Sequence, residues 1–234
     1  MIYRRTEKVV RRLAQRHAAI LAAARSAADE GGMAAVQIAP VAERAGIAAG
    51  TVYRYFPAKS DLVAALVATV ADSEISALRR AADAAPGPLS AIAAAVTTFA
   101  ARALGRRRLA WAVIAEPVDP DVEGVRLGFR RALAAELQRC IETATRGGQL
   151  PAQDAALAAA ALVGALLEGL IGPLAPHATD QPARRRELVQ AMTLIALRTV
   201  GVVDAHARGL VMQTAVPAGE TTSERIFGAH PDQA

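Results

Sequence analysis

The chain has 234 residues and a mass of 24.3 kDa, enough for one large or two small domains with a hydrophobic core. Apolar residues make up 53% of it and aromatic residues only 3%, while 58 residues are alanine. Alanine is the strongest helix former, whereas β-rich folds favour Val, Ile, Thr and aromatic residues. The composition therefore argues against a β-sandwich or barrel and predicts an all-α protein. A mean hydropathy of +0.24 with 21% charged residues excludes a globally disordered chain.

The net charge of +5 is concentrated at the N-terminus, where residues 1–16 contain six basic residues and one acid. The remaining residues sum to zero charge. A localised basic segment on a neutral body favours an anionic partner, with nucleic acid first and a membrane surface second. A solvated basic terminus is the plainer alternative on charge alone.

The single cysteine, Cys140, excludes an intrachain disulfide, so a reducing cytoplasm is the expected location. Cys140 itself is expected to be a small core residue. The first 30 residues lack the continuous apolar stretch of a signal peptide. The most apolar run, residues 155–175, is interrupted by Glu168 and has Pro173 near its end. We therefore expect a buried helix of a soluble protein there and no membrane span.

Glycine and proline clusters divide the chain into helix-length segments. The first predicted helix covers residues 7–30, and two very short helices follow between residues 36 and 55. A long helix is predicted over residues 60–84, with Ser60 as N-cap and Asp61 in its first turn. Five more helices are predicted over residues 89–104, 106–116, 121–146, 152–174 and 181–202. The absence of any βαβ pattern disfavours a Rossmann or P-loop enzyme.

Residues 37–56, QIAPVAERAGIAAGTVYRYF, form the segment whose pattern carries a function. Val41 and Ala42 supply the apolar face of one short helix, Gly46 permits a left-handed turn, and Val52 with Phe56 anchors a second helix. Such a helix-turn-helix places its second helix in the major groove of DNA. The groups suited to phosphate contacts cluster at the end of this segment: Tyr53, Arg54, Tyr55 and Lys59.

From Arg16 to Val67 the chain resembles the DNA-binding domain of TetR-type (TetR/AcrR) transcriptional repressors. The matching residues are Ile20-Leu21, Ala23-Ala24, Gly32-Met33, Val41-Ala42, Ala45-Gly46-Ile47, Gly50-Thr51-Val52-Tyr53, Tyr55-Phe56, Lys59 and Leu62. The rest of the chain matches only in the number and length of its predicted helices, because the C-terminal domain of this family varies widely in sequence.

The resemblance implies an all-helical homodimer. Residues 1–62 would form a helix-turn-helix domain with a basic arm, and residues 63–206 a helical domain for effector binding and dimerisation. Residues 207–234 are expected to be a disordered tail, because the chain from about Thr214 is rich in Gly, Pro, Thr and charge. The implied function is repression from a palindromic operator that a small-molecule effector releases. The many aliphatic residues of the chain favour an apolar or acyl-type effector. A transcriptional activator of the same family is the alternative. The dimer is expected to form through the last two long helices.

DNA contacts are expected from eight residues: Arg4, Arg5, Lys8, Thr51, Tyr53, Arg54, Tyr55 and Lys59. Thr51 suits a phosphate or a thymine methyl group, and Arg54 a guanine edge or a phosphate. Lys59 suits a phosphate near a helix N-terminus. The family places the two tyrosines at the DNA backbone or in the packing of the domain. The plainer alternatives are a core aromatic for Tyr53 and solvated charges for Arg54 and Lys59.

The chain departs from the family pattern at Ala48-Ala49, where many relatives have Ser or Thr followed by a basic or polar residue. Alanine is a poor N-cap, at a cost of about 1 kcal/mol relative to serine. It also removes two possible hydrogen-bond donors to bases. Base recognition is therefore expected to depend chiefly on Arg54 and Thr51, with the basic arm supplying much of the affinity.

The candidate ligand-binding residues are Trp111, Glu116, Arg126, Phe129 and Glu168. The first four flank the break at residues 117–120. Glu168 is the one charge in an apolar helix, and a buried carboxylate needs a partner or a raised pKa. It either pairs across the dimer interface with Arg184 or Arg185, or orients a ligand. The many aliphatic residues predict a largely aliphatic pocket.

An enzyme, a metal site and a cofactor are not expected. The four histidines share no metal-like spacing with acids or cysteine, and no Gly-x-Ser-x-Gly motif or phosphate loop occurs. A membrane-surface module remains an alternative because the first helix is basic. That helix lacks the Trp and Phe anchors that such modules use, so no membrane partner is expected.

Overall fold

Helices account for every regular element in the part of the chain that the structure describes, which confirms the all-α class. The structure, a computed structural model, describes residues 2–176 and 181–217, with side chains from residue 7 onward. In chain order the elements are α1 (Ile2–Gly31), the 3-10 turn η1 (Met33–Ala35), α2 (Ile38–Arg44), α3 (Ala49–Tyr55), α4 (Lys59–Asp83), α5 (Pro88–Gly105), α6 (Arg107–Ile114), α7 (Pro120–Arg146), α8 (Ala155–Leu170), α9 (Pro182–Thr199) and α10 (Asp204–Gln213).

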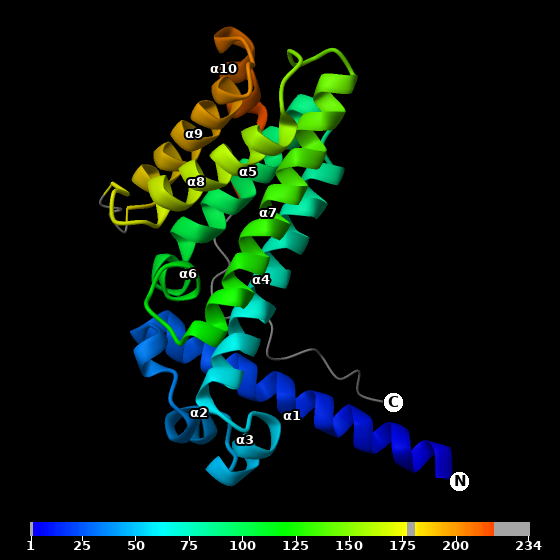
Figure 1. Ribbon diagram of the computed structural model, residues 1–234, viewed down its shortest axis with the longest axis vertical. Helices are drawn as coiled ribbons and strands as arrows, with labels where there is room; N and C mark the ends of the chain where they lie inside the picture. Colours follow the sequence, from blue (N-terminus) through cyan, green and yellow to red (C-terminus); the bar gives the residue numbers. More distant parts are fainter. Residues whose placement is uncertain (1, 177–180, 218–234) are drawn as a thin grey trace, which may run out of the picture.

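The first three helices lie together at one end of the molecule, beside the start of α4, and the N-terminal half of α1 projects away from the other helices (Figure 1). Helix α4 leaves this end and packs between α5 and α7. Helix α5 also packs against α9, and α7 against α8. Helices α4 to α10 form the larger body of the molecule. Within this body, α8, α9 and α10 lie on the side away from α4 (Figure 1). Short α6 lies at the end of this body that faces α1, which it contacts directly.

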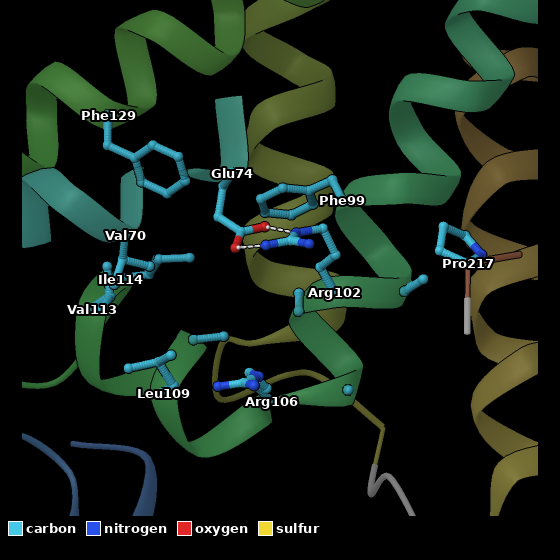
Figure 2. Close-up of a pocket in the computed structure, with 14 residues that line it drawn as sticks. Val70, Glu74, Phe99, Arg102, Arg106, Leu109, Val113, Ile114, Phe129 and Pro217 are labelled. Carbon is cyan, nitrogen blue, oxygen red and sulfur yellow. Dashed lines mark hydrogen bonds and ion pairs between the residues drawn. The ribbon is translucent and has the colours of Figure 1, made fainter. Parts of the chain in front are cut away.

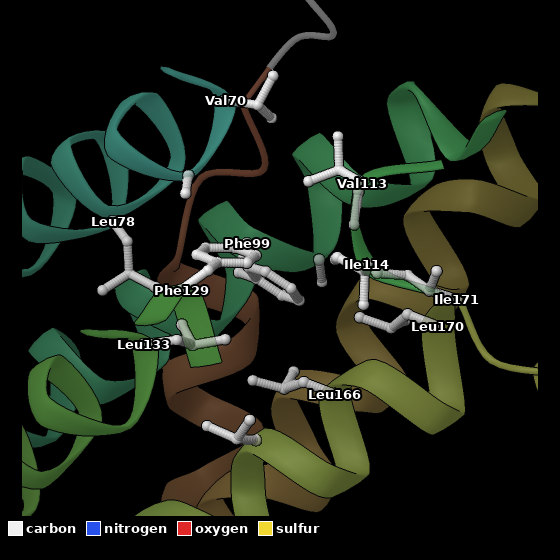
Figure 3. Close-up of a cluster of buried hydrophobic side chains, with 14 of the residues drawn as sticks. Val70, Leu78, Phe99, Val113, Ile114, Phe129, Leu133, Leu166, Leu170 and Ile171 are labelled. Atoms are coloured by element: carbon white, nitrogen blue, oxygen red, sulfur yellow. The ribbon is translucent and has the colours of Figure 1, made fainter. Parts of the chain in front are cut away.

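The core of the body is built from a few large side chains between many alanines. Phe99 of α5, Phe129 and Leu133 of α7, and Leu166 and Leu170 of α8 converge in one cluster (Figure 3). Leu133 and Leu166 are fully buried, and burial of such a side chain stabilises the fold by about 1.5–3 kcal/mol. Alanines on the neighbouring faces allow the helices to approach closely.

Helix α5, among the described residues, is long and apolar enough by length and composition to cross a membrane. However, 61% of that stretch is buried inside the protein, where it contacts α4, α7 and α9. Central helices of folded proteins commonly have this character. The run that seemed most apolar in the sequence, residues 155–175, contains the 16-residue α8 and the turn that follows it.

A buried carboxylate joins α4 to α7. Glu136 of α7, only 5% exposed, accepts a hydrogen bond of 2.8 Å from Arg79 Nε of α4 and one of 3.2 Å from Arg139 Nε. Arg139 also donates to Asp83 at the end of α4, at 3.0 Å. Hydrogen bonds from Arg79 first, and then from Arg139, hold the pKa of Glu136 below its ordinary value of 4.5, although burial acts to raise it. The helix pair thus depends on an ionised Glu136.

Two sequence expectations about helix ends were wrong. The N-cap of the long helix is Ala58 and not Ser60, because the Asp61 carboxylate accepts the Ala58 N–H at 2.9 Å and closes the helix start. The expected disordered tail began at residue 207, but residues 204–213 form α10, whose buried Ala207, Leu210 and Val211 account for its docking. Residues 218–234 of that tail lie outside the described residues.

Replacing Glu136 with Gln is expected to lower the free energy of unfolding at pH 7 by about 1.5–3 kcal/mol, the usual contribution of a hydrogen bond to a charged group. Because the folded pKa of Glu136 lies below 4.5, its contribution is present above that pH and is lost as pH falls through the folded value. The difference between wild type and Glu136→Gln should therefore shrink below pH 4.5. Urea unfolding at several pH values measures this.

Glu142→Gln is the matched control, since Glu142 lies on the same helix but is exposed and accepts only from Gln138. It should change the unfolding free energy by less than about 0.5 kcal/mol. A Glu136→Gln difference that stays constant from pH 7 to pH 3 would contradict the role of the ionised carboxylate.

Candidate DNA-binding surface and ligand cavity

The turn between α2 and α3 has the geometry that its glycine predicts. Gly46 has a φ of 66°, the left-handed region that favours glycine, which confirms the expected turn. The Ile47 N–H bonds back to the Ala42 carbonyl at 3.0 Å, so the chain reverses directly after α2. Val41 and Val52, both fully buried, then hold α2 and α3 together from opposite sides of the turn.

Helix α3 presents a polar surface to solvent. Its N-cap residue, Ala48, makes no side-chain capping bond, as the sequence predicts. Arg54 is exposed and Tyr53 is 52% exposed, so Tyr53 is not a core aromatic. Thr51 is half-buried on the same helix, and Lys59 is the exposed first residue of α4. These four side chains are polar groups that this end of the molecule offers to a partner.

Tyr55 belongs to the packing of this end and not to its open surface. It is half-buried, and its hydroxyl is buried without a hydrogen-bond partner in the described part of the chain. The ring of His17 lies against it, with centroids 6.2 Å apart, and lies closer to Phe56, at 5.1 Å. The structure thus separates the two tyrosines that the sequence placed in one group.

An ion pair fixes α2 against α1. Arg44 of α2 donates to both oxygens of Glu30, at 2.5 and 2.7 Å, and to the Ser26 hydroxyl at 2.7 Å. The bonds from Arg44, and then from Ser26, lower the pKa of Glu30 from 4.5 to about 2. The Arg44–Glu30 ion pair lies on the surface, where ion pairs add little to stability. Its main effect is therefore to orient α2, and with it α3, on the first helix.

The basic N-terminal segment is a continuation of α1. The helix runs for 30 residues from Ile2, so the backbone of the expected arm is helical. Lys8 is exposed on it, whereas the side chains of Arg4 and Arg5 lie outside the described residues. A straight helix carries its charges at fixed spacing, in contrast to a flexible arm.

Helix α6 and the turn after it hold the end of α1. Three polar contacts join them: Arg106 Nη1 to Asp29 Oδ2 at 3.5 Å, Arg108 Nη2 to the Gly31 carbonyl at 2.9 Å, and the Met33 N–H to Glu116 Oε2 at 3.0 Å. These contacts connect residues 77 to 83 positions apart in the chain. They position the small N-terminal group of helices on the body.

Gly32, at the centre of this junction, is required there for two reasons. Its φ of 75° lies in the region that favours glycine. A Cβ at this position would lie 2.5 Å from Glu116 Oε2 and 2.7 Å from Arg108 Nη2. The junction therefore depends on a residue without a side chain.

A partly open cavity of about 140 Å³ lies between α4, α5, α6 and α7, with Pro217 from the segment after α10 also in its lining. Its apolar lining includes Val70, Phe99, Leu109, Val113, Ile114 and Phe129 (Figure 2). Glu74 and Arg102 line one wall and form a paired ion bridge, with Nε–Oε2 at 2.7 Å and Nη2–Oε1 at 2.9 Å. Arg106, at the junction of α5 and α6, also lines the cavity. The cavity therefore suits a small apolar molecule with a polar end.

Of the five candidate ligand residues from the sequence, Phe129 alone lines this cavity in the described structure. Trp111 is half-buried against the core from α6. Arg126 is 3% exposed and bonds to the Ala112 carbonyl at 2.7 Å, so it ties α7 to α6. Glu116 belongs to the junction with α1, as described above.

Glu168 is exposed in the single chain and not buried, contrary to expectation. Its Oε1 accepts the Leu174 N–H at 3.0 Å, which closes the turn after α8. Neither Arg184 nor Arg185 is bonded to it within the chain. Arg184 pairs instead with Glu187, at 2.9 Å.

The sequence reasoning missed the polar wall of the cavity. Arg102 is the only charged residue in α5, three positions after Phe99. A single charge in an apolar helix is a usable signal of a functional residue, and Arg102 satisfies it as Glu168 does. The partner of Arg102, Glu74, is on another helix, 28 residues away, and no local pattern indicates it.

Ala48→Ser should stabilise the protein by about 1 kcal/mol, because a serine at the N-cap of α3 can accept a hydrogen bond that alanine cannot. The change is read from the free energy of urea unfolding. Ala49→Ser, one position further on and inside the helix, is the matched control and should give no gain. Equal unfolding free energies for the two variants would contradict the prediction that a serine at position 48 caps α3.

Comparison with known proteins places residues 20–66 in a described family, that of the bacterial regulatory proteins of the tetR family. Over 54 residues the chain is 48% identical to the HTH-type transcriptional repressor KstR of Rhodococcus jostii (strain RHA1). Over 49 residues it is 51% identical to KstR of Mycolicibacterium smegmatis. These matches span 23% and 21% of this chain, and only 26% and 24% of the two repressors, about a quarter of their length.

Solved structures extend the similarity to the whole fold. RolR without ligand superposes with a TM-score of 0.62 at 23% identity, over 86% of this chain and 99% of RolR. FadR from Bacillus subtilis, in complex with stearoyl-CoA, gives 0.64 at 18% identity, over 79% of this chain and 98% of FadR. The helix-turn-helix geometry and the family model thus agree for residues 20–66, which match the tetR family of bacterial regulatory proteins, and most of the chain shares the fold of the solved structures.

Proposed function

We propose that the protein is a ligand-responsive transcriptional repressor that binds a palindromic operator as a homodimer. Residues 1–62 form its DNA-binding domain and residues 63–206, extended by α10, its effector-binding and dimerisation domain. A small apolar or acyl-type effector in the α4–α7 cavity releases the DNA. The protein acts in the cytoplasm, where its operator is accessible.

The observation that carries this proposal is the polar surface of α3 next to a basic helix. Arg54, Tyr53 and Lys59 are exposed on one end of the molecule, and the buried Val52 fixes the helix that presents them. Arginine can bond a guanine edge with two hydrogen bonds, while lysine suits phosphate. The exposed Lys8 on the projecting part of α1 adds a further charge for the DNA backbone.

The dimer interface is proposed on the outer face of α8. No charged residue lies between Asp154 and Glu168, yet Leu157, Ala161 and Ala165 are all exposed in the single chain. A solvent-facing helix normally carries charge on its outer face. Ile195 of α9, 49% exposed, extends the same kind of surface to the neighbouring helix. Small residues allow a second copy to approach closely, so a bundle of α8 and α9 from two subunits is expected.

Repression and release by a ligand are supported by the relatives. The KstR proteins are named as transcriptional repressors, and the solved FadR and RolR structures contain stearoyl-CoA and resorcinol. The cavity of about 140 Å³ here favours a compact effector over one as long as a stearoyl chain.

Arg54→Ala is expected to weaken operator binding by about ten- to a hundred-fold and to relax specificity at one base pair, because a base contact of about 1–3 kcal/mol is lost. The triple change of Arg4, Arg5 and Lys8 to Ala should weaken all DNA sequences alike. It should also reduce the slope of log affinity against log salt by about 3.

Mobility-shift titrations on DNA flanking the coding region, at two salt concentrations with competitor DNA, measure the loss of affinity in Arg54→Ala and the change of salt slope in the triple variant.

Arg80→Ala is the charge-matched control. Arg80 is exposed near the far end of α4, roughly 30 Å along the helix from Lys59, and should leave DNA affinity unchanged. An unchanged salt slope in the triple variant would remove the N-terminal helix from the interface. Wild-type binding that disappears under competitor DNA would contradict site-specific regulation.

Ala161→Arg is expected to dissociate the dimer, because it places a charge in the middle of the proposed apolar interface. Sedimentation velocity should show wild type as a dimer of 24.3-kDa chains and this variant as a monomer. Ala135→Arg, at an exposed alanine of α7 outside the proposed face, should remain a dimer. If both variants remain dimers, the interface does not lie on the outer face of α8.

A further inference from the structure

The cavity has the size of a single ring. At about 140 Å³ it is close to an apolar cavity of about 150 Å³ that holds benzene in another protein. Phe99 and Phe129 border it, and its apolar lining also includes aliphatic side chains of α4 and α6, alanines of α5, and Pro217 (Figures 2 and 3). Such walls favour the body of a compact aromatic or branched molecule.

Three charged side chains line the cavity, and they are engaged to different degrees. Glu74 and Arg102 face each other through two short bonds, at 2.7 and 2.9 Å, with side chains 17% and 18% exposed. Their charges offset each other. Among the described residues, the Arg106 side chain has one polar contact, to Asp29, and its length of 3.5 Å is well beyond the 2.7–2.9 Å or so that is usual for a charged pair. The Arg106 guanidinium is therefore the positive charge in the wall that an anionic ligand can bind.

We propose, building on the ligand-responsive function above, that the effector is a compact monocarboxylate with an aromatic or branched apolar body. Its carboxylate binds Arg106 in place of Asp29, and its body fills the apolar part of the cavity. The Glu74–Arg102 pair stays closed and supplies a neutral wall.

This exchange couples the cavity to the DNA-binding helices. Asp29 lies on α1 two residues before its end, and its contact to Arg106 is the one α1–α6 contact whose arginine also lines the cavity. A carboxylate on Arg106 releases Asp29 and leaves α1 held by the Arg108 and Glu116 contacts. By linkage, a ligand that weakens DNA binding must itself bind less tightly to the DNA-bound protein, by the same factor.

Benzoate, benzamide and benzylamine test the charge requirement, because they share one ring and differ in the charge of the head group. Isothermal titration of the full chain should show benzoate binding, benzamide at least tenfold weaker and benzylamine without measurable heat. Benzamide binding as tight as benzoate, or no benzoate binding, would overturn the proposal.

Two variants should change benzoate affinity in opposite directions, which a purely structural role of the Arg106–Asp29 contact would not produce. Arg106→Gln should weaken benzoate binding at least tenfold, because the anion loses its partner. Asp29→Asn should tighten it several-fold, because the competing carboxylate is gone. Arg107→Gln is the matched control: its side chain bonds the Pro176 carbonyl at 3.0 Å and does not line the cavity, so benzoate affinity should not change. A shift of both test variants in the same direction contradicts the exchange at Arg106.

The DNA measurement separates this proposal from the proposed function. Benzoate should raise the operator Kd of wild type at least tenfold and that of Asp29→Asn clearly less, since its contact is already absent. If the ligand-free protein binds its operator but benzoate changes nothing, only the effector proposal fails. If the ligand-free protein binds no operator, the proposed function fails, while the titrations with benzoate still decide the cavity.

Discussion

The close approach at Gly32 is the constraint on which the arrangement of the two parts depends. The chain leaves α1 with a φ of 75° there, and the side chains of Arg108 and Glu116 occupy the space where a Cβ would lie. Glu116 can therefore reach the Met33 N–H at 3.0 Å, and Arg108 the Gly31 carbonyl at 2.9 Å. These bonds bring α6 onto the end of α1, and the small N-terminal helix-turn-helix unit becomes continuous with the body that contains the cavity.

Helix α4 provides a second, stiffer connection. Its 25 residues span roughly 37 Å at the usual rise per residue. The same helix begins with Lys59 beside α3, lines the cavity with Val70 and Glu74, and ends in the ion cluster around Glu136. One continuous helix therefore joins the cavity wall to Lys59, a residue proposed to contact DNA, and is fixed to α7 at its other end.

The sequence sufficed for the DNA-binding unit because that unit is defined by local spacing. Gly46, Val52 and Phe56 lie within about ten positions of one another, and each has one physical reason to be where it is. The cavity was not predictable in the same way. In a body where a quarter of the residues are alanine, periodicity separates inner from outer faces poorly, so rare residues such as Trp111 were selected as ligand contacts. The contacts that matter, such as Glu74 with Arg102, join different helices and leave no local pattern.

Helix α6 is the element whose position is least determined by its own sequence. Eight residues are too few to form a stable helix alone, and it is bounded by non-helical backbone at Arg106 and Ala115. Its place is set by Leu109 and Val113 in the cavity wall, by Arg126 of α7, which bonds the Ala112 carbonyl, and by the polar contacts to α1. A helix held by its neighbours on both sides responds to a change on either side. In the proposed function, occupancy of the cavity and the orientation of the N-terminal helices are linked through α6 in both directions.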